Sequence, residues 1–210
     1  MREPKLANPP QWLSRHQDKK EGDYFPTPPW ATRSLVKYVV PGLNTGQKYS
    51  ILEPAMGGGH MARTLAEYGH TIEGYDKEPR ASGILEGDFF EDIAPNSHDF
   101  VITNPPYAGA EDWVHHALIK ARIGVAMLLR VQFLEGGGRY DRLFSTIPPK
   151  RIAFFANRIP FKKNIVVRNA SKYFFHVWLY WDSVDPTPLP PIWIPYNAQQ
   201  LLEKDSDYEA

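Results

Sequence analysis

The sequence of 210 residues contains no cysteine, which excludes disulfide bonds, thiolate metal ligands and a cysteine nucleophile. It also lacks any run close to the roughly 18 apolar residues of a membrane-spanning helix. The first residues have no apolar core of the kind found in signal peptides. We therefore expect a soluble, cytoplasmic protein that binds neither a membrane nor a metal ion.

The net charge is also zero, but the charges are unevenly distributed. From Arg139 to Lys172 the chain carries nine Lys or Arg residues and a single acid, Asp141, and we call this stretch the basic segment. The rest of the chain therefore has more acids than bases. Such a segment is either a solvated surface or the electrostatic footprint of a nucleic-acid partner.

The composition is that of a folded protein, with 42% hydrophobic, 13% aromatic and 23% charged residues. The polar, proline-containing residues 1–22 predict a flexible arm, and residues 23–182 have the length and pattern of one domain. Residues 183–210 read as a tail. Its first part holds five prolines and cannot be a central strand, and its last dozen residues are acidic and are expected to fray.

Short strand patterns alternate with helix patterns through the first 130 residues. Helices are expected behind the glycines of residues 57–59 and over 111–122. Strands are expected at 50–54, 70–76, 83–88, 99–104, 123–130, 151–156 and 172–181. The alternation predicts an α/β, Rossmann-like fold, a mostly parallel twisted sheet with helices on both faces. Ligands of such sheets bind beyond the carboxyl ends of the strands.

Three of these strand ends carry residues suited to a nucleoside. The first is followed by "EPAMGGGH", whose glycines let backbone approach a ligand closely. The second ends at Asp76, 19 residues after Gly57, where an acid can bind both ribose hydroxyls. The third leads into "EGDFF", in which Asp88 and Phe89 suit an adenine amino group and ring.

Glu53 separates two classes of nucleotide cofactor. It lies at the end of the first strand, beside the glycine loop, where a dinucleotide would place its pyrophosphate. A carboxylate repels a pyrophosphate but attracts a sulfonium or ammonium group. The sequence therefore favours S-adenosylmethionine over a nicotinamide dinucleotide.

The fourth strand ends in "NPPY", residues 104–107, which is poor for both helix and strand. Asn104 offers a side-chain carbonyl and Pro105 a backbone carbonyl, and Pro105 and Pro106 make the turn rigid. Two such acceptors can hold both hydrogens of an exocyclic amino group. Tyr107 adds a ring face on which a planar amine-bearing group can stack.

In order and spacing, "EPAMGGG", "YD", "GDFF" and "NPPY" resemble the motif series of S-adenosylmethionine-dependent amino-methyltransferases. "DYFPTPPW" (23–30) resembles the extra N-terminal motif of adenine-N6 DNA methyltransferases, especially phage and prophage forms. The likeness continues through "LLRVQFLEG", "RIAFFANRIPF" and "YFFHVWLYWD", and so spans about residues 23 to 182. It implies a Rossmann-like methyltransferase that methylates adenine N6 in DNA.

The resemblance also implies residue roles. The expected cofactor contacts are Tyr24, Phe25, Thr27, Glu53, Ala55, Gly57, Asp76, Asp88 and Phe89. The expected catalytic motif is Asn104, Pro105, Pro106 and Tyr107, with Phe161 clamping a flipped base against Tyr107. The expected nucleic-acid face is Arg139, Arg158, Lys162, Lys163 and Arg168.

One departure from the family concerns specificity. Only 16 residues separate Asp88 from Asn104, which leaves no room for a target-recognition domain and predicts a short or relaxed sequence preference. Three alternatives stay open. An RNA methyltransferase would also need positive charge, a protein-glutamine methyltransferase would share "NPPY" without the basic segment, and a binding module would not need an intact cofactor loop.

Overall fold

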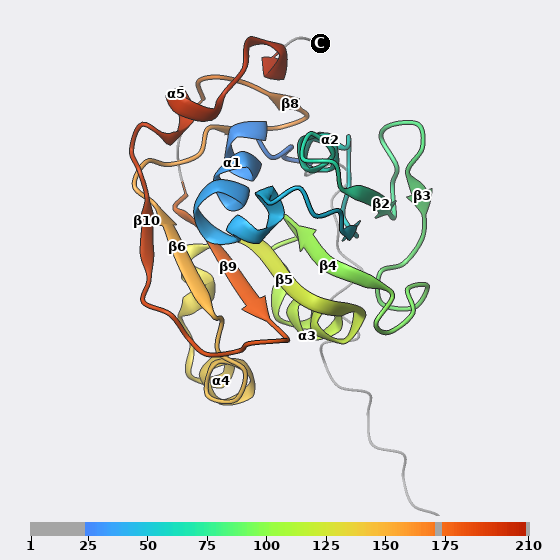
Figure 1. Cartoon of the computed structure of the whole chain (residues 1–210), viewed down its shortest axis with the longest axis vertical. Helices are drawn as coiled ribbons and strands as arrows, with labels where there is room; N and C mark the ends of the chain where they lie inside the picture. The colour runs from blue at the N-terminus through green and yellow to red at the C-terminus, as the bar shows by residue number, and fades with distance from the viewer. Residues whose placement is uncertain (1–23, 171–173, 209–210) are drawn as a thin grey trace, which may run out of the picture.

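The computed structural model describes residues 24–170 and 174–208, so the predicted arm at 1–22 lies outside the described residues. Its centre is an eight-stranded sheet in the order β10-β6-β9-β5-β4-β1-β2-β3 (Figure 1). The strands are β1 (Ser50–Glu53), β2 (Thr71–Asp76), β3 (Leu85–Glu86), β4 (His98–Thr103), β5 (Ala121–Arg130), β6 (Arg151–Phe155), β9 (His176–Asp182) and β10 (Ile192–Ile194). A separate hairpin pairs β7 (Phe161–Lys162) with β8 (Ile165–Val166).

The predicted mostly parallel sheet is confirmed. Strands β3, β2, β1, β4 and β5 pair parallel with one another in that order. Strand β9 inserts antiparallel between β5 and β6, and β10 pairs parallel with β6 at the edge. All seven strands predicted from the sequence are present with shifted ends, and the part of the last prediction at residues 172–173 lies outside the described residues.

Helices cover both faces of the sheet, as predicted (Figure 1). They are α1 (Pro29–Ser34), α2 (His60–Ala66), α3 (Ala110–Lys120), α4 (Gly137–Arg139) and α5 (Ala198–Leu202). Short π-helices are η2 (Leu35–Val39) and η5 (Tyr140–Phe144). Short 3-10 helices are η3 (Pro41–Asn44), η4 (Val131–Leu134) and η6 (Asp205–Tyr208). None of these described helices is both long and apolar enough to cross a membrane.

The side chains of β5 show how the two layers form. Ala126 and Leu128 point to the core that contains α1 and α2, whereas Val125, Met127 and Leu129 point to the core that contains α3. All five are at most 1% exposed. A continuous apolar run is what a strand buried on both faces requires, because successive side chains alternate between the faces.

Two helix predictions need correction. The helix expected over 111–122 is α3, which ends at Lys120, and β5 starts directly at Ala121. Helix α1 is not among the helices predicted from the sequence. Pro29 occupies the first turn of α1, where a missing N–H costs nothing and the fixed φ favours the helix.

The prediction that the last dozen residues fray is wrong for those described, up to Tyr208. The guanidinium of Arg33 in α1 is 4% exposed and donates hydrogen bonds to Glu67, to Asp207 and to the carbonyl of Leu202 at 2.7–2.8 Å. A buried guanidinium requires such partners, and the acidic C-terminal segment supplies two of them. The acidity that suggested disorder therefore neutralises a buried cation.

We predict that Asp207→Ala lowers the free energy of unfolding by about 2–4 kcal/mol, because it removes one partner of a buried ion pair. Urea denaturation followed by circular dichroism measures the change. The matched control is Asp205→Ala, whose carboxylate pairs with exposed Arg168 and is itself 93% exposed, so little change is expected. Equal effects of the two substitutions would show that the C-terminal segment is not anchored through Arg33.

Candidate active site

The carboxyl ends of four parallel strands meet at one edge of the sheet. Because β1 pairs with β2 on one side and β4 on the other, Glu53, Asp76 and Asn104 come from adjacent strand ends. Strand β3 pairs with β2 and is followed two residues later by Asp88. The sheet thus brings the residues predicted at the four strand ends to one edge.

Tyr24 packs directly on the glycine loop that follows β1. Its hydroxyl accepts a hydrogen bond from the Gly58 N–H at 2.8 Å and is hydrogen-bonded to His60 Nδ1 at 3.1 Å. A Cβ at Gly57 would run into the Tyr24 ring, and Gly57 also has a φ of +54°. The sequence therefore needs glycine here to let an aromatic ring approach the backbone.

Glu53 ends β1 as a buried carboxylate, 3% exposed. Burial raises its pKa well above the usual value, and the Asp76 carboxylate adds to the shift. Its Oε2 atom is buried without a hydrogen-bond partner. A buried acceptor left unpaired is costly, so this position suits a ligand that brings a donor or a positive charge. Ala55 follows, half-buried, at the start of the loop.

Asp76 and Asp88, the acids after the second and third strands, both accept hydrogen bonds from backbone N–H groups. Asp76 accepts hydrogen bonds from the Gly57 N–H at 2.7 Å and the Glu78 N–H at 2.8 Å, so it anchors the glycine loop to β2. Asp88 accepts one from the Phe90 N–H and forms an ion pair with Lys77. Both carboxylates retain lone pairs for a ligand, since each oxygen can accept more than one hydrogen bond.

Phe89 requires a correction. It is 1% exposed, and its ring stacks on Trp113 of α3 with 4.8 Å between centroids. The ring belongs to the core and offers no face to an adenine. Phe90 beside it is half-buried. The motif "GDFF" could not tell which of two adjacent aromatics turns inward, because this depends on where α3 packs.

Asn104 follows β4 with its amide fixed by a neighbour. Its Nδ2 donates a hydrogen bond to Thr27 Oγ1 at 3.1 Å, and its Oδ1 is buried without a partner. Thr27 is 5% exposed. Thus the segment at residues 24–27, far away in sequence, holds the amide so that its carbonyl oxygen is left to a ligand. Pro105 is buried and Pro106 half-buried behind it.

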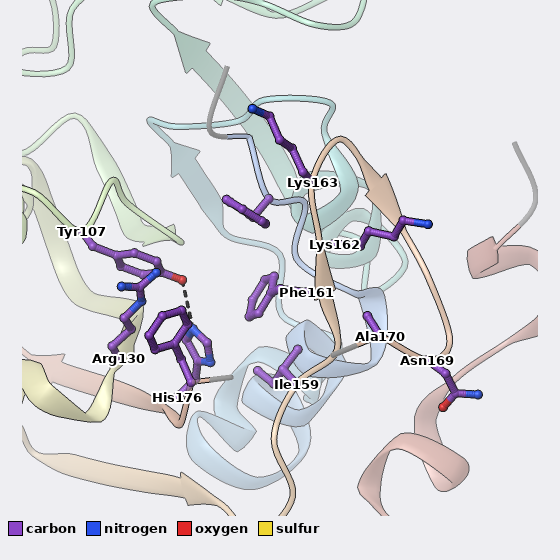
Figure 2. Close-up of a pocket in the computed structure, with 11 residues that line it drawn as sticks. Tyr107, Arg130, Ile159, Phe161, Lys162, Lys163, Asn169, Ala170 and His176 are labelled. Atoms are coloured by element: carbon purple, nitrogen blue, oxygen red, sulfur yellow. Dashed lines mark hydrogen bonds between the residues drawn. The ribbon is translucent and has the colours of Figure 1, made fainter. Parts of the chain in front are cut away.

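Tyr107 forms one wall of a cavity of about 550 Å³, and Phe161 lies across from it (Figure 2). His176 joins them: its Nε2 is 3.0 Å from the Tyr107 hydroxyl, and its ring centroid lies 4.7 Å from that of Phe161. Phe25, 37% exposed, lines the same cavity instead of the glycine loop. Burial and the nearby Arg130 cation lower the pKa of His176 to about 4, so it is neutral near pH 7.

His176 and Arg130 were missed by the sequence analysis. Arg130 ends the predicted strand 123–130 and His176 lies within the predicted strand 172–181, so neither stands out as a site residue. The signal was the antiparallel pairing of β5 with β9, which sets Arg130 opposite His176. That pairing could not be inferred from either strand alone.

Part of the positive charge of the basic segment is neutralised by acids from other parts of the chain. Arg139 forms an ion pair with Glu111 and donates to the carbonyls of Phe133 and Glu135. Arg168 pairs with Asp205 and Glu203. These two predicted members of the nucleic-acid face are therefore already engaged by neighbouring groups. The fold brings acids from elsewhere in the chain to them.

Of the other three predicted members, two line the cavity. Lys162 and Lys163, on and after β7, line it, and both are exposed (Figure 2). The Arg158 guanidinium lies over the ring of Phe175, 4.1 Å from its centroid. Two lysine side chains thus lie at the mouth of the cavity. Over the described residues, no group of three or more His, Asp or Glu side chains could hold a metal ion.

The fold is similar to that of several solved structures, two of which are provisionally described as methyltransferases. One from Listeria monocytogenes, provisionally described as a class I S-adenosylmethionine-dependent methyltransferase, superposes with a TM-score of 0.60 and 12% identity, over 87% of this chain and 69% of that one. A Pyrococcus horikoshii protein provisionally described as an RNA methyltransferase gives 0.54 and 15%, over 82% and 89%. Protein 1320 of Thermoplasma acidophilum gives 0.54 and 18%, over 81% and 94%.

No family model and no curated protein matches the sequence. The structural likeness establishes a Rossmann-like fold of the class I methyltransferase type. At sequence identities of 12–18% this likeness identifies the fold alone, and the chemistry depends on the residues of the site.

We predict that Gly57→Ala lowers the free energy of unfolding by about 1–3 kcal/mol, because it forces a side chain into a positive φ and against Tyr24. Chemical denaturation measures the effect. Gly42→Ala is the control, because nothing lies within 4 Å of a Cβ at that position. A tolerated Gly57→Ala would mean that Tyr24 does not pack on the loop in solution.

Proposed function

We propose that this protein transfers a methyl group from S-adenosylmethionine to the N6 amino group of adenine in DNA. The observation that carries the proposal is Asn104, whose amide oxygen is buried, unpaired and oriented by Thr27 at the end of β4. A buried acceptor of this kind is stabilised by a ligand with hydrogens to donate. An exocyclic amino group has two.

The strand ends beside Asn104 fit the proposed cofactor. The unpaired, buried Glu53 oxygen suits an ammonium group, and the glycine loop leaves room for backbone to approach a ligand. Asp76 retains acceptor capacity for ribose hydroxyls, and Asp88 for an amino group. Thr27 is hydrogen-bonded to Asn104 and Tyr24 to Gly58, so both residues lie beside the proposed cofactor site. When bound, S-adenosylmethionine supplies an electrophilic methyl group.

The chain's own part in the reaction is to position and polarise the amine. Asn104 Oδ1 and the Pro105 carbonyl accept its two hydrogens, which draws the nitrogen lone pair out of conjugation with the ring. The nitrogen would take the methyl group as the sulfur–methyl bond of the donor breaks, which leaves a neutral thioether, and the cationic nitrogen would then lose a proton to water. No side chain has to act as a general base. Tyr107 holds the ring plane by stacking.

The cavity beside Asn104 supports a nucleic-acid substrate. A base must leave its stack before its amino group can react, and an extruded base needs an apolar, aromatic pocket. Tyr107, Phe161 and Phe25 provide the rings, with Lys162 and Lys163 at the mouth for phosphate contacts. A protein side-chain amide would need neither feature.

RNA is the second candidate substrate. Rings and lysines of this kind would serve an RNA base equally well, and the similar fold of the Pyrococcus horikoshii protein, provisionally described as an RNA methyltransferase, favours it. The resemblance of "DYFPTPPW" to adenine-N6 DNA enzymes favours DNA.

We predict that the protein, given labelled cofactor, produces N6-methyladenine in DNA. Nucleoside digestion and mass spectrometry of parallel DNA, RNA and protein reactions give the measurement. Rising salt should suppress the reaction steeply, because phosphate contacts release counterions. Label in RNA alone would move the assignment to RNA, and label in protein alone would refute a nucleic-acid substrate.

We also predict that Asn104→Ala lowers the rate of methyl transfer about a hundredfold or more, because the loss falls on the transition state. Affinity for S-adenosylhomocysteine, measured by calorimetry, should stay within a few-fold of the parent. The control Asn44→Ala changes an exposed residue of η3 and should alter neither quantity. A parallel loss of cofactor affinity would place Asn104 in the cofactor site instead.

A further inference from the structure

Arg130 lies at the end of β5, and its guanidinium covers the ring of Tyr107. The guanidinium carbon is 4.1 Å from the centroid of Tyr107 and 3.7 Å from the centroid of Phe174. A planar cation therefore lies over two aromatic rings in the wall of the cavity, and Figure 2 shows Arg130 beside Tyr107. These are stacking distances that a flat heterocycle would also adopt.

Several arginines of this chain form ion pairs with carboxylates. Arg33 pairs with Glu67 and Asp207, Arg122 with Asp99, and Arg142 with Glu111. No ion pair of Arg130 is found within residues 24–170 and 174–208, and its Nε is buried without a hydrogen-bond partner. The neighbours of this half-buried guanidinium are two ring faces and the Tyr107 hydroxyl, all of them neutral, so an anion would compete well for it.

The two rings under the guanidinium differ in how firmly they are held. The Tyr107 hydroxyl is hydrogen-bonded to His176, which is 4% exposed and lies in β9, inside the sheet. Phe174 is 43% exposed. Tyr107 is thus fixed, whereas a long arginine side chain can change rotamer. Any ligand that stacks on this face of Tyr107 has to displace Arg130.

We propose that Arg130 reversibly occupies the base site, covering Tyr107 in the free protein and giving way to the target base. The displaced guanidinium then binds a phosphate of the same strand, next to Lys162 and Lys163 at the cavity mouth. One side chain would thereby weaken the binding of planar molecules that lack a phosphate and strengthen the binding of a base that is attached to a phosphodiester. The inference rests on the proposed nucleic-acid substrate and adds a means of discrimination to it.

The test compares two probes that differ in phosphate. One is the fluorescent nucleoside 2-aminopurine deoxyriboside, which has a base but no phosphate. The other is a short single-stranded oligonucleotide with one central 2-aminopurine. Saturating S-adenosylhomocysteine keeps the nucleoside out of the cofactor's own adenine site. Quenching of the fluorescence by stacking reports binding of either probe.

Arg130→Ala should change the two affinities in opposite directions. The nucleoside should bind roughly fivefold more tightly, because no cation has to leave the ring. The oligonucleotide should bind more weakly, and the slope of log affinity against log salt should fall by about 1, as expected for one lost phosphate contact. Arg130→Lys keeps the charge without the planar stack, so it should tighten nucleoside binding and leave oligonucleotide affinity near that of the parent.

Arg142→Ala is the matched control, since it removes an arginine already paired with Glu111, and both affinities should stay unchanged. Weaker or unchanged nucleoside binding in both Arg130 variants would overturn the proposal and make Arg130 a fixed support of Tyr107. That result is independent of the proposed function, which fails instead if the parent protein methylates neither DNA nor RNA. If Arg130→Ala does not fold, Arg130→Lys decides alone.

Discussion

The parallel pairing of β1 with both β2 and β4 is the constraint on which the site depends. Parallel strands present their carboxyl ends at one edge of the sheet. The chain adds β2 and β3 on one side of β1 and then β4 and β5 on the other side, so β1 lies at the topological switch point. Glu53, Asp76 and Asn104 meet there without any contact between their own side chains having to bring them together. The free energy for this arrangement comes from the two apolar layers of β5 and its neighbours, far from the chemistry.

At this edge the protein keeps polar atoms that folding alone would not favour. Oxygens of Glu53 and Asn104 are buried without partners, and the half-buried Arg130 has no carboxylate in the described part of the chain. The buried Arg33, by comparison, is paired with Glu67 and Asp207. Unpaired groups at the strand ends are therefore positions at which a ligand can supply the missing partner.

Tyr24 connects the two halves of the candidate site. Its hydroxyl binds the glycine loop at Gly58, and its backbone carbonyl accepts a hydrogen bond from Asn164 at 2.9 Å in the turn between β7 and β8. The same hairpin carries Phe161 and Lys162 to the cavity. The proposed cofactor loop and the proposed nucleic-acid hairpin are thus in contact through one residue of the "DYFPTPPW" segment.

The mostly parallel sheet, the order of the strand-end motifs and the acceptor groups of "NPPY" could all be predicted from the amino-acid sequence. These are local properties: apolar runs select buried strands, and glycines and prolines select turns. The tertiary structure decided whatever depends on distant partners. It turned Phe89 into the core against Trp113, gave Arg139 and Arg168 acids from remote segments, and set His176 opposite Arg130. It also converted an acidic tail into the counter-charge of Arg33, because whether a charge is free or paired depends on what packs beside it and not on its neighbours in sequence.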